Sequence, residues 1–249
     1  MANFEKYDVA TILEVSGNTS GLLNLKVSRP DTLRFSAGQF LMAGFEIDNR
    51  LLMKAYSIAS SIYADYIEFL CRIIPDGKMS KILKEVKPGQ HIILNKKPTG
   101  TLLVRDLNDG DNMYLLATGT GVAPFLSIIQ DVDTYKKFKS IEIWHSSRHP
   151  EEAMHTQIDI LLYDNPLIST YADQFRYHMY LTANTEFPAP RITTVLNNMT
   201  FDNNKDRFMI CGNPQFNKDV VDILTHKGFK PSPHMGSAGD FLTEKAFVS

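Results

Sequence analysis

The sequence predicts two domains: an antiparallel β-barrel followed by an α/β domain with a doubly wound parallel sheet. The chain has 249 residues, which is enough for two hydrophobic cores. In its first part, short apolar stretches alternate with turn residues; after about residue 106, apolar stretches alternate with amphipathic ones. Residues 106–111 are polar and contain a glycine, as expected of a linker. We therefore expect one domain at residues 1–103 and the other at residues 104–249.

The first part contains strand-like stretches separated by Gly, Asn, Asp or Pro. These stretches cover residues 10–15, 23–27, 40–45, 66–73 and 91–94. One short helix is expected at residues 78–86, ending before the Pro88-Gly89 pair. Because helices do not separate the strands, the pattern favours an antiparallel barrel.

The second part has the alternation typical of parallel strands joined by crossover helices. Strands are expected at residues 113–117, 141–145, 177–182 and 207–211. Helices are expected between and after them, at residues 122–132, 151–162, 193–199 and 217–226. This order predicts a doubly wound, nucleotide-binding type of fold.

Composition excludes several classes of protein. A formal net charge of −2 gives no general attraction to nucleic acid or to a membrane. The two cysteines, Cys71 and Cys211, lie in apolar stretches, which indicates a reducing compartment and no iron–sulfur ligand set. The histidines lack the spacing of a metal site, so no metal is expected. The charged start and the absence of a long apolar run predict a cytoplasmic protein.

The first candidate motif combines a cation, an aromatic ring and a hydroxyl in one short strand. Its sequence is Lys54-Ala55-Tyr56-Ser57. Side chains of a strand alternate between faces, and twist or a bulge could bring these groups around a flat ligand that carries phosphate. A strand at a sheet edge that ends in a serine-rich turn is the alternative.

The second candidate motif is a glycine-rich turn between a predicted strand and a predicted helix. It reads Thr118-Gly119-Thr120-Gly121-Val122-Ala123-Pro124. Glycines let backbone approach a pyrophosphate, and a helix start offers unpaired N–H groups. The pair Cys211-Gly212 follows another predicted strand in a similar way. A tight turn that binds nothing remains the alternative for each.

These motifs, in this order, resemble the ferredoxin (flavodoxin)–NADP reductase family, and its bacterial branch most of all. The likeness covers nearly the whole chain and includes Lys97-Pro98-Thr99-Gly100-Thr101-Leu102 and the final Ala246-Phe247-Val248-Ser249. It implies that the barrel binds FAD, that the α/β domain binds NADP(H), and that the protein is an enzyme. The implied partner is ferredoxin or flavodoxin, and the implied oligomeric state is a monomer.

The resemblance also implies the residues that contact FAD. Tyr56 would stack on the flavin and Ser57 would bond near N5, while Lys54 stands where the family has a pyrophosphate-binding arginine. Ala246 would lie over the flavin and Phe247 on the adenine. The full implied set is Lys54, Ala55, Tyr56, Ser57, Cys71, Arg72, Ile73, Gly77, Met79, Ser80, Thr118, Ala246, Phe247, Val248 and Ser249.

For NADP, the resemblance implies contacts at the turns and at arginines for the 2′-phosphate. Arg148 and Arg191 match two such arginines, but a third position is Asn184, which leaves the preference for NADP open. The implied set is Thr118, Gly119, Thr120, Gly121, Arg148, Asn184, Arg191, Cys211 and Gly212. The implied catalytic residues are Ser57, Cys211 and Glu244.

Charge is unevenly distributed along the chain. Residues 71–105 hold eight basic and two acidic side chains, a net +6 against −8 for the rest. This stretch is either a solvated face or a docking surface for an acidic redox protein. Two other functions stay open: an NADH-dependent flavin reductase component of an oxygenase or another electron-transfer system, which Asn184 favours, and a flavin-binding relay subunit without turnover.

Overall fold

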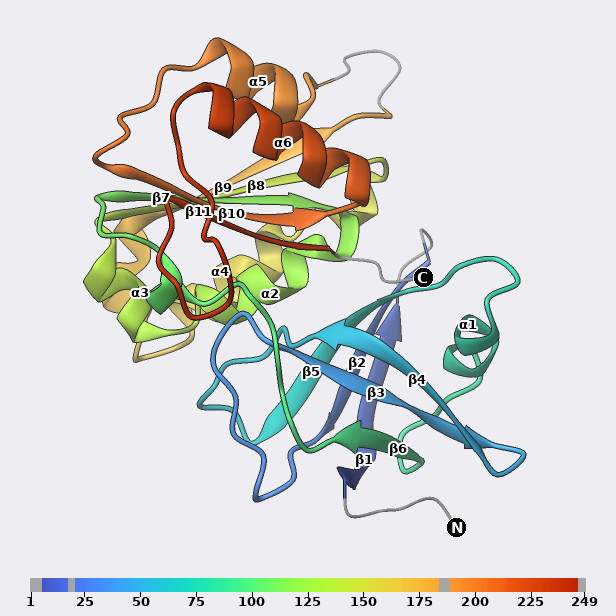
Figure 1. Ribbon diagram of the computed structural model, residues 1–249. Helices are drawn as coiled ribbons and strands as arrows, with labels where there is room; N and C mark the ends of the chain where they lie inside the picture. Colours follow the sequence, from blue (N-terminus) through green and yellow to red (C-terminus); the bar gives the residue numbers. More distant parts are fainter. Residues whose placement is uncertain (1–5, 18–20, 184–188, 246–249) are drawn as a thin grey trace.

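The computed structural model describes residues 6–17, 21–183 and 189–245. Figure 1 shows two parts: strands β1–β6 form one, and strands β7–β11 with most of the helices form the other. A single connection, through the short 3-10 turn Val104–Asp106, joins them.

The first part is a closed antiparallel barrel. Its strands lie in the order β4-β3-β6-β1-β2-β5. A bridge between Ile58 and Phe69 joins the two ends of this order and closes the ring. The predicted antiparallel barrel is confirmed. Its strands are β1 (Tyr7–Gly17), β2 (Leu22–Ser28), β3 (Phe40–Ile47), β4 (Arg50–Ser57), β5 (Tyr66–Arg72) and β6 (His91–Asn95).

One short helix, α1 (Lys78–Leu83), lies on the barrel. It is shorter than the predicted stretch of residues 78–86. The chain leaves the helix in turns ahead of Pro88, whose ring disfavours the helical conformation in the residue before it.

The second part is a parallel sheet in the order β11-β10-β7-β8-β9. The predicted doubly wound sheet is confirmed. It has one strand more than the sequence prediction, because β11 carries only two buried apolar residues, Phe241 and Leu242. Chain order reverses between β7 and β10, so the carboxyl ends of these strands form a switch point. The strands are β7 (Asn112–Thr118), β8 (Ser140–Ser147), β9 (Phe175–Leu181), β10 (Asp206–Gly212) and β11 (Phe241–Lys245).

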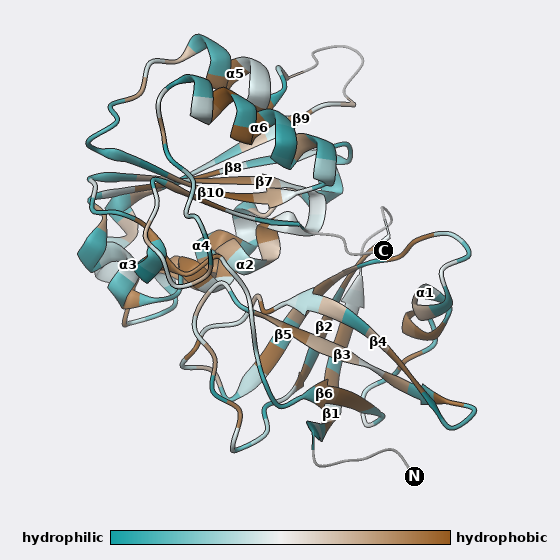
Figure 2. Cartoon of the chain, viewed as in Figure 1, coloured by the Kyte–Doolittle hydropathy of each residue, from teal (hydrophilic) through white to brown (hydrophobic). Residues whose placement is uncertain are grey.

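Helices cover both faces of this sheet. In Figure 1, α2 (Ala123–Ile128), α3 (Val132–Lys137) and α4 (His155–Tyr163) lie on the face toward the barrel. The opposite face carries α5 (Ile192–Asn198) and α6 (Pro214–His226). Figure 2 shows apolar residues along the central strands β7 and β10, which these two layers bury.

The single helix predicted at residues 122–132 is wrong. A 3-10 turn (Gly119–Val122) precedes α2, and α3 is a separate helix. The break has a local cause, since the Asp131 side chain accepts the Asp133 N–H and caps the start of α3. The predicted helix at residues 151–162 is likewise divided, into a 3-10 turn (Pro150–Glu152) and α4.

The connection between the two parts is packed rather than free. Leu107 pairs with Gly239, and Asn108 Nδ2 donates to Asp240 Oδ1 at 2.8 Å. Lys137 Nζ donates to the Leu107 carbonyl at 2.5 Å. Within the described residues, no helix has the length and apolar character needed to cross a membrane.

Candidate functional site

Two turns meet at the switch point of the parallel sheet, one after β7 and one after β10. A Cβ atom on Gly121 would lie 2.1 Å from the Cys211 carbonyl oxygen, and one on Gly212 would lie 2.5 Å from Thr118 Oγ1. The Asn213 amide also donates to Thr118 Oγ1 at 3.2 Å. Both positions therefore require glycine: Gly121 lies directly against the Cys211 backbone, and Gly212 lies against the side chains of Thr118 and Phe216.

A buried histidine forms a hydrogen bond with the first turn. His145 Nε2 lies 2.9 Å from the Gly119 carbonyl oxygen, and Nδ1 lies 2.9 Å from the Tyr177 hydroxyl. Because a carbonyl can only accept, Nε2 carries the proton. Burial lowers the pKa of His145 to about 4, so the ring is neutral at physiological pH. The sequence analysis gave His145 no role.

The motif in β4 presents its side chains at different depths. Lys54 is exposed, whereas the ring of Tyr56 is half-buried against the barrel core, with its centroid 5.9 Å from that of Phe69. Burial raises the pKa of Tyr56 well above its usual value, so its hydroxyl stays protonated. Ser57 ends the strand, next to the buried Ile58.

Helix α2 and the two residues after it connect the glycine turn with the segment that follows the β4 motif. Ser127 Oγ donates to the Ser60 carbonyl at 2.7 Å, and Gln130 Nε2 donates to the Ala59 carbonyl at 3.1 Å. All four residues are buried. Since α2 begins directly after the 3-10 turn Gly119–Val122, these bonds bring the two predicted motifs together across the boundary between the domains.

Two predicted catalytic residues, Cys211 and Glu244, lie opposite each other on neighbouring strands β10 and β11. Burial raises the pKa of Glu244 from 4.5 to about 7. Its Oε2 accepts the Thr101 N–H at 2.9 Å, which ties β11 to the barrel side. Burial, with Glu244 nearby, raises the pKa of Cys211 well above its usual value, so the thiol is protonated.

The remaining predicted residues are spread around these elements. Ser80 is buried, and its Oγ accepts the Ile74 N–H at 2.8 Å, which shapes the loop into α1. Cys71 and Met79 are buried in the barrel. Arg148, just after β8, and Arg191, at the start of α5, are both exposed. Asn184, Ala246, Phe247, Val248 and Ser249 lie outside the described residues.

Comparison with known proteins finds two family domains in the chain. The oxidoreductase FAD-binding domain family matches residues 6–103, and the oxidoreductase NAD-binding domain family matches residues 115–222. A ferredoxin–NADP reductase of Pseudomonas aeruginosa is 37% identical over 95% of this chain and 96% of its own. The chain belongs to the ferredoxin–NADP reductase family.

Other members of the family agree. A flavodoxin/ferredoxin–NADP reductase of Rhodobacter capsulatus is 35% identical over 97% of this chain and 93% of its own. The crystal structure of a family member from Neisseria gonorrhoeae, with bound FAD and NADP, superposes with a TM-score of 0.87 at 31% identity. It covers 97% of this chain and 99% of that one.

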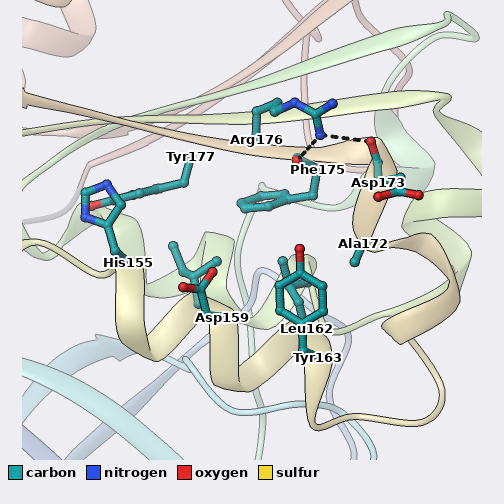
Figure 3. A pocket seen from close by; sticks show the side chains of 10 residues that line it. His155, Asp159, Leu162, Tyr163, Ala172, Asp173, Phe175, Arg176 and Tyr177 are labelled. Carbon is teal, nitrogen blue, oxygen red and sulfur yellow. Dashed lines mark hydrogen bonds between the residues drawn. The ribbon is translucent and has the colours of Figure 1, made fainter.

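A cavity of about 280 Å³ lies away from the residues predicted from the family. Figure 3 shows it between α4 and β9, with Asp159 and Tyr163 on one side and Arg176 on the other. None of its lining residues belongs to the predicted flavin or nucleotide sets. Tyr177 links the cavity to the site, because its hydroxyl lies 2.9 Å from His145 Nδ1.

Sequence reasoning missed the residues that join the two domains. Ser127 and Gln130 were read as part of one amphipathic helix, although buried polar side chains within an apolar helix are uncommon enough to signal a partner. Thr101 belongs to a stretch that resembles the family and Glu152 to a predicted helix, but neither local sequence identifies a partner, because the partners lie 143 and 80 residues away.

Proposed function

We propose that this protein is an FAD-dependent oxidoreductase that transfers electrons between NADP(H) and ferredoxin. The observation that carries the proposal is a pair of hydrogen bonds from α2 and the turn directly after it to the segment after the β4 motif, Ser127 to Ser60 and Gln130 to Ala59. They fix the glycine turn of the parallel sheet next to the flavin motif of the barrel. An oxidoreductase of this family needs that juxtaposition, since hydride passes only between groups in contact.

The turns at the switch point fit a dinucleotide. Gly121 packs against the Cys211 backbone and Gly212 against the Thr118 and Phe216 side chains, so neither position has room for a Cβ atom. Gly119 has φ of +54°, and its carbonyl oxygen lies 2.9 Å from His145 Nε2. The proposed contacts of NADP(H) are Thr118, Gly119, Thr120, Gly121, Arg148, Arg191, Cys211, Gly212 and Asn184.

The barrel strand β4 fits a flavin. A half-buried tyrosine followed by serine offers a flat apolar face beside a hydroxyl, and Lys54 supplies an exposed cation for phosphate. When bound, FAD accepts the electron pair of a hydride and releases electrons singly. The proposed contacts are Lys54, Ala55, Tyr56, Ser57, Cys71, Ile73, Gly77, Met79, Ser80, Thr118 and the final residues 246–249.

Around the reacting centre, the side chains act by holding or releasing protons and not by nucleophilic attack. Because the Cys211 thiol is protonated, it presents a small uncharged side chain near the end of β10. Glu244 Oε2 accepts from Thr101, so Oε1 carries the proton when the carboxyl is neutral. With a pKa of about 7, Glu244 can hold or release that proton near neutral pH. Ser57 would orient the flavin.

Flavodoxin is a second proposed carrier, and the docking surface we propose is the exposed basic face of α1. Lys78, Lys81 and Lys84 are exposed there. Replacing all three by Gln should slow carrier reduction and flatten its dependence on salt, while ferricyanide reduction stays unchanged. Gln at Lys136, Lys139 and Lys205, exposed on the other domain, is the matched control. Parallel salt curves for all variants would reject this surface.

A monomeric state and a cytoplasmic location remain predictions from the sequence.

The coenzyme preference tests the proposed function. We expect kcat/KM for ferredoxin reduction to be higher with NADPH than with NADH. Arg148→Ala should raise KM for NADPH about tenfold and KM for NADH little, because only NADPH carries the 2′-phosphate. Arg50→Ala removes an exposed arginine of the barrel hairpin and serves as the control. A preference for NADH would favour the alternative, a flavin reductase component of another electron-transfer system.

A further inference from the structure

An ion pair joins the barrel to the parallel-sheet domain at the mouth of the site. Arg72 Nη1 lies 2.7 Å from Glu152 Oε1, and the two residues are 80 positions apart. Arg72 is the last residue of β5, and Glu152 ends the 3-10 turn after β8. The Glu152 side chain is only 3% exposed and that of Arg72 22%. A carboxylate this deeply buried needs its partners to stay charged.

The two oxygens of Glu152 face different elements. Oε1 meets Arg72 of the barrel, and Oε2 accepts a hydrogen bond from the hydroxyl of Ser147. Ser147 is buried at the end of β8, directly before Arg148, which we propose as a contact of the 2′-phosphate. Glu152 is therefore a single carboxylate that links Arg72 in the barrel to the adenosine-phosphate end of the nucleotide site.

Arg72 also lies beside the other end of that site. A Cβ atom on Gly119 would be 3.8 Å from Arg72 Nη2, the nearest atom among the described residues apart from those next to Gly119 in the chain. The guanidinium thus lies beside the glycine turn. The resemblance to the family assigned Arg72 to FAD, but its observed ion pair is with the domain that carries the nucleotide turn.

From these contacts, and resting on the proposed function, we propose that Arg72 and Glu152 are positioning residues for the nicotinamide dinucleotide. Arg72 sets the distance between the glycine turn and the barrel, and so the approach of the nicotinamide to the flavin. Ser147, which donates a hydrogen bond to the same carboxylate, positions Arg148 to contact the 2′-phosphate. The three residues should therefore give three different kinetic patterns when replaced.

Arg72→Met keeps the length of the side chain and removes its charge. At saturating NADPH, the rate of anaerobic flavin reduction measured by stopped flow should fall about tenfold. The FAD content of the purified protein and the dissociation constant of 2′-phospho-AMP, measured by calorimetry, should stay within about twofold of wild type. The 2′-phospho-AMP probe carries only the adenosine-phosphate half, so it reports on Arg148 and not on the nicotinamide.

Ser147→Ala should give the opposite pattern. Affinity for 2′-phospho-AMP should fall about fivefold, with the saturated rate of flavin reduction within about twofold of wild type. Glu152→Gln should lower both the saturated rate of flavin reduction and the affinity for 2′-phospho-AMP. Lys139→Met breaks an exposed ion pair with Asp111 (2.8 Å) and is the matched control, expected to change neither quantity.

The pattern can fail in clear ways. An unchanged rate in Arg72→Met, or a loss of FAD with a normal rate per bound flavin, would overturn the positioning role. If Arg72→Met does not fold, Arg72→Lys and Glu152→Gln carry the test: the lysine should recover part of the rate that the glutamine loses, and equal rates would overturn it. Wild-type protein that NADPH does not reduce would instead contradict the proposed function itself.

Discussion

The nucleotide turn at residues 118–122 and the flavin motif at residues 54–57 are built in different ways. The turn is held by close backbone packing, with Gly121 directly against the Cys211 carbonyl of the neighbouring strand β10. The flavin motif consists of side chains on a barrel strand, from exposed Lys54 to half-buried Tyr56. A site made of backbone tolerates almost no substitution, whereas a site made of side chains can accept a change such as lysine for arginine and still bind.

The largest effect should follow from adding a single methyl group to the turn. Gly121→Ala places Cβ 2.1 Å from the Cys211 carbonyl oxygen, so the strand ends must separate, and we expect a loss of about 3 kcal/mol in the free energy of unfolding. Gly119→Ala, two residues away, places its Cβ 3.8 Å from Arg72 Nη2, the nearest non-adjacent atom of the described residues, so its main cost is strain at φ of +54°, about 1 kcal/mol. Urea unfolding compares the two, and equal losses would contradict the tight packing.

Glu244 lies between the two regions and should make stability depend on pH. Its pKa rises from 4.5 to about 7 in the folded state, so the folded protein binds more protons in this interval. Stability should therefore fall as pH rises from about 5 to 8, and Glu244→Gln should remove a part of that fall on the order of 2 kcal/mol. Urea unfolding at both pH values measures it. Identical pH slopes in the two proteins would show that Glu244 is not buried as a neutral acid.

The contribution of His145 to the pH dependence of stability has the opposite sign to that of Glu244 and does not affect this comparison. Burial lowers its pKa from 6.5 to about 4, so it reduces stability as pH falls below about 6.5. That contribution is present in both wild type and Glu244→Gln, so it cancels when their slopes are subtracted.

A smaller effect is expected on the flavin side. Tyr56→Leu keeps an apolar side chain in the barrel but removes the flat ring, so the dissociation constant of FAD should rise about tenfold, or about 1.4 kcal/mol. Tyr66→Leu replaces another half-buried barrel tyrosine, whose ring lies under Lys26 Nζ at 3.8 Å, and should not change FAD binding. Equal losses of flavin from the two variants would mean that Tyr56 acts only through barrel stability. Flavin fluorescence on dilution measures both.

The sequence predicted the elements whose pattern is local. Strand and helix periodicity identified the barrel and the doubly wound sheet, and glycine spacing identified the turn at residues 119–121. The errors came where a side chain overrides periodicity: Asp131 starts α3 by capping it, which splits a helix predicted as one. Strand β11 was missed because only Phe241 and Leu242 mark it as buried.

The contacts between the domains could not be predicted. Arg72 with Glu152, Thr101 with Glu244, and Ser127 with Ser60 each join residues at least 67 positions apart. Nothing in the local sequence of either partner specifies the other, because the pairing depends on how the two domains dock. Arg72 is likewise in the set of flavin contacts that the resemblance implies, and its ion pair connects it to the opposite domain.

The most direct test of the account is an anaerobic titration of the purified protein, following the flavin absorption band as NADPH, and separately NADH, is added. We predict that FAD copurifies or can be restored, and that the band bleaches near one equivalent of NADPH but only at much higher NADH. A protein that holds no flavin after FAD is added, or whose flavin neither coenzyme bleaches, would contradict the central claim that the two motifs form one electron-transfer site.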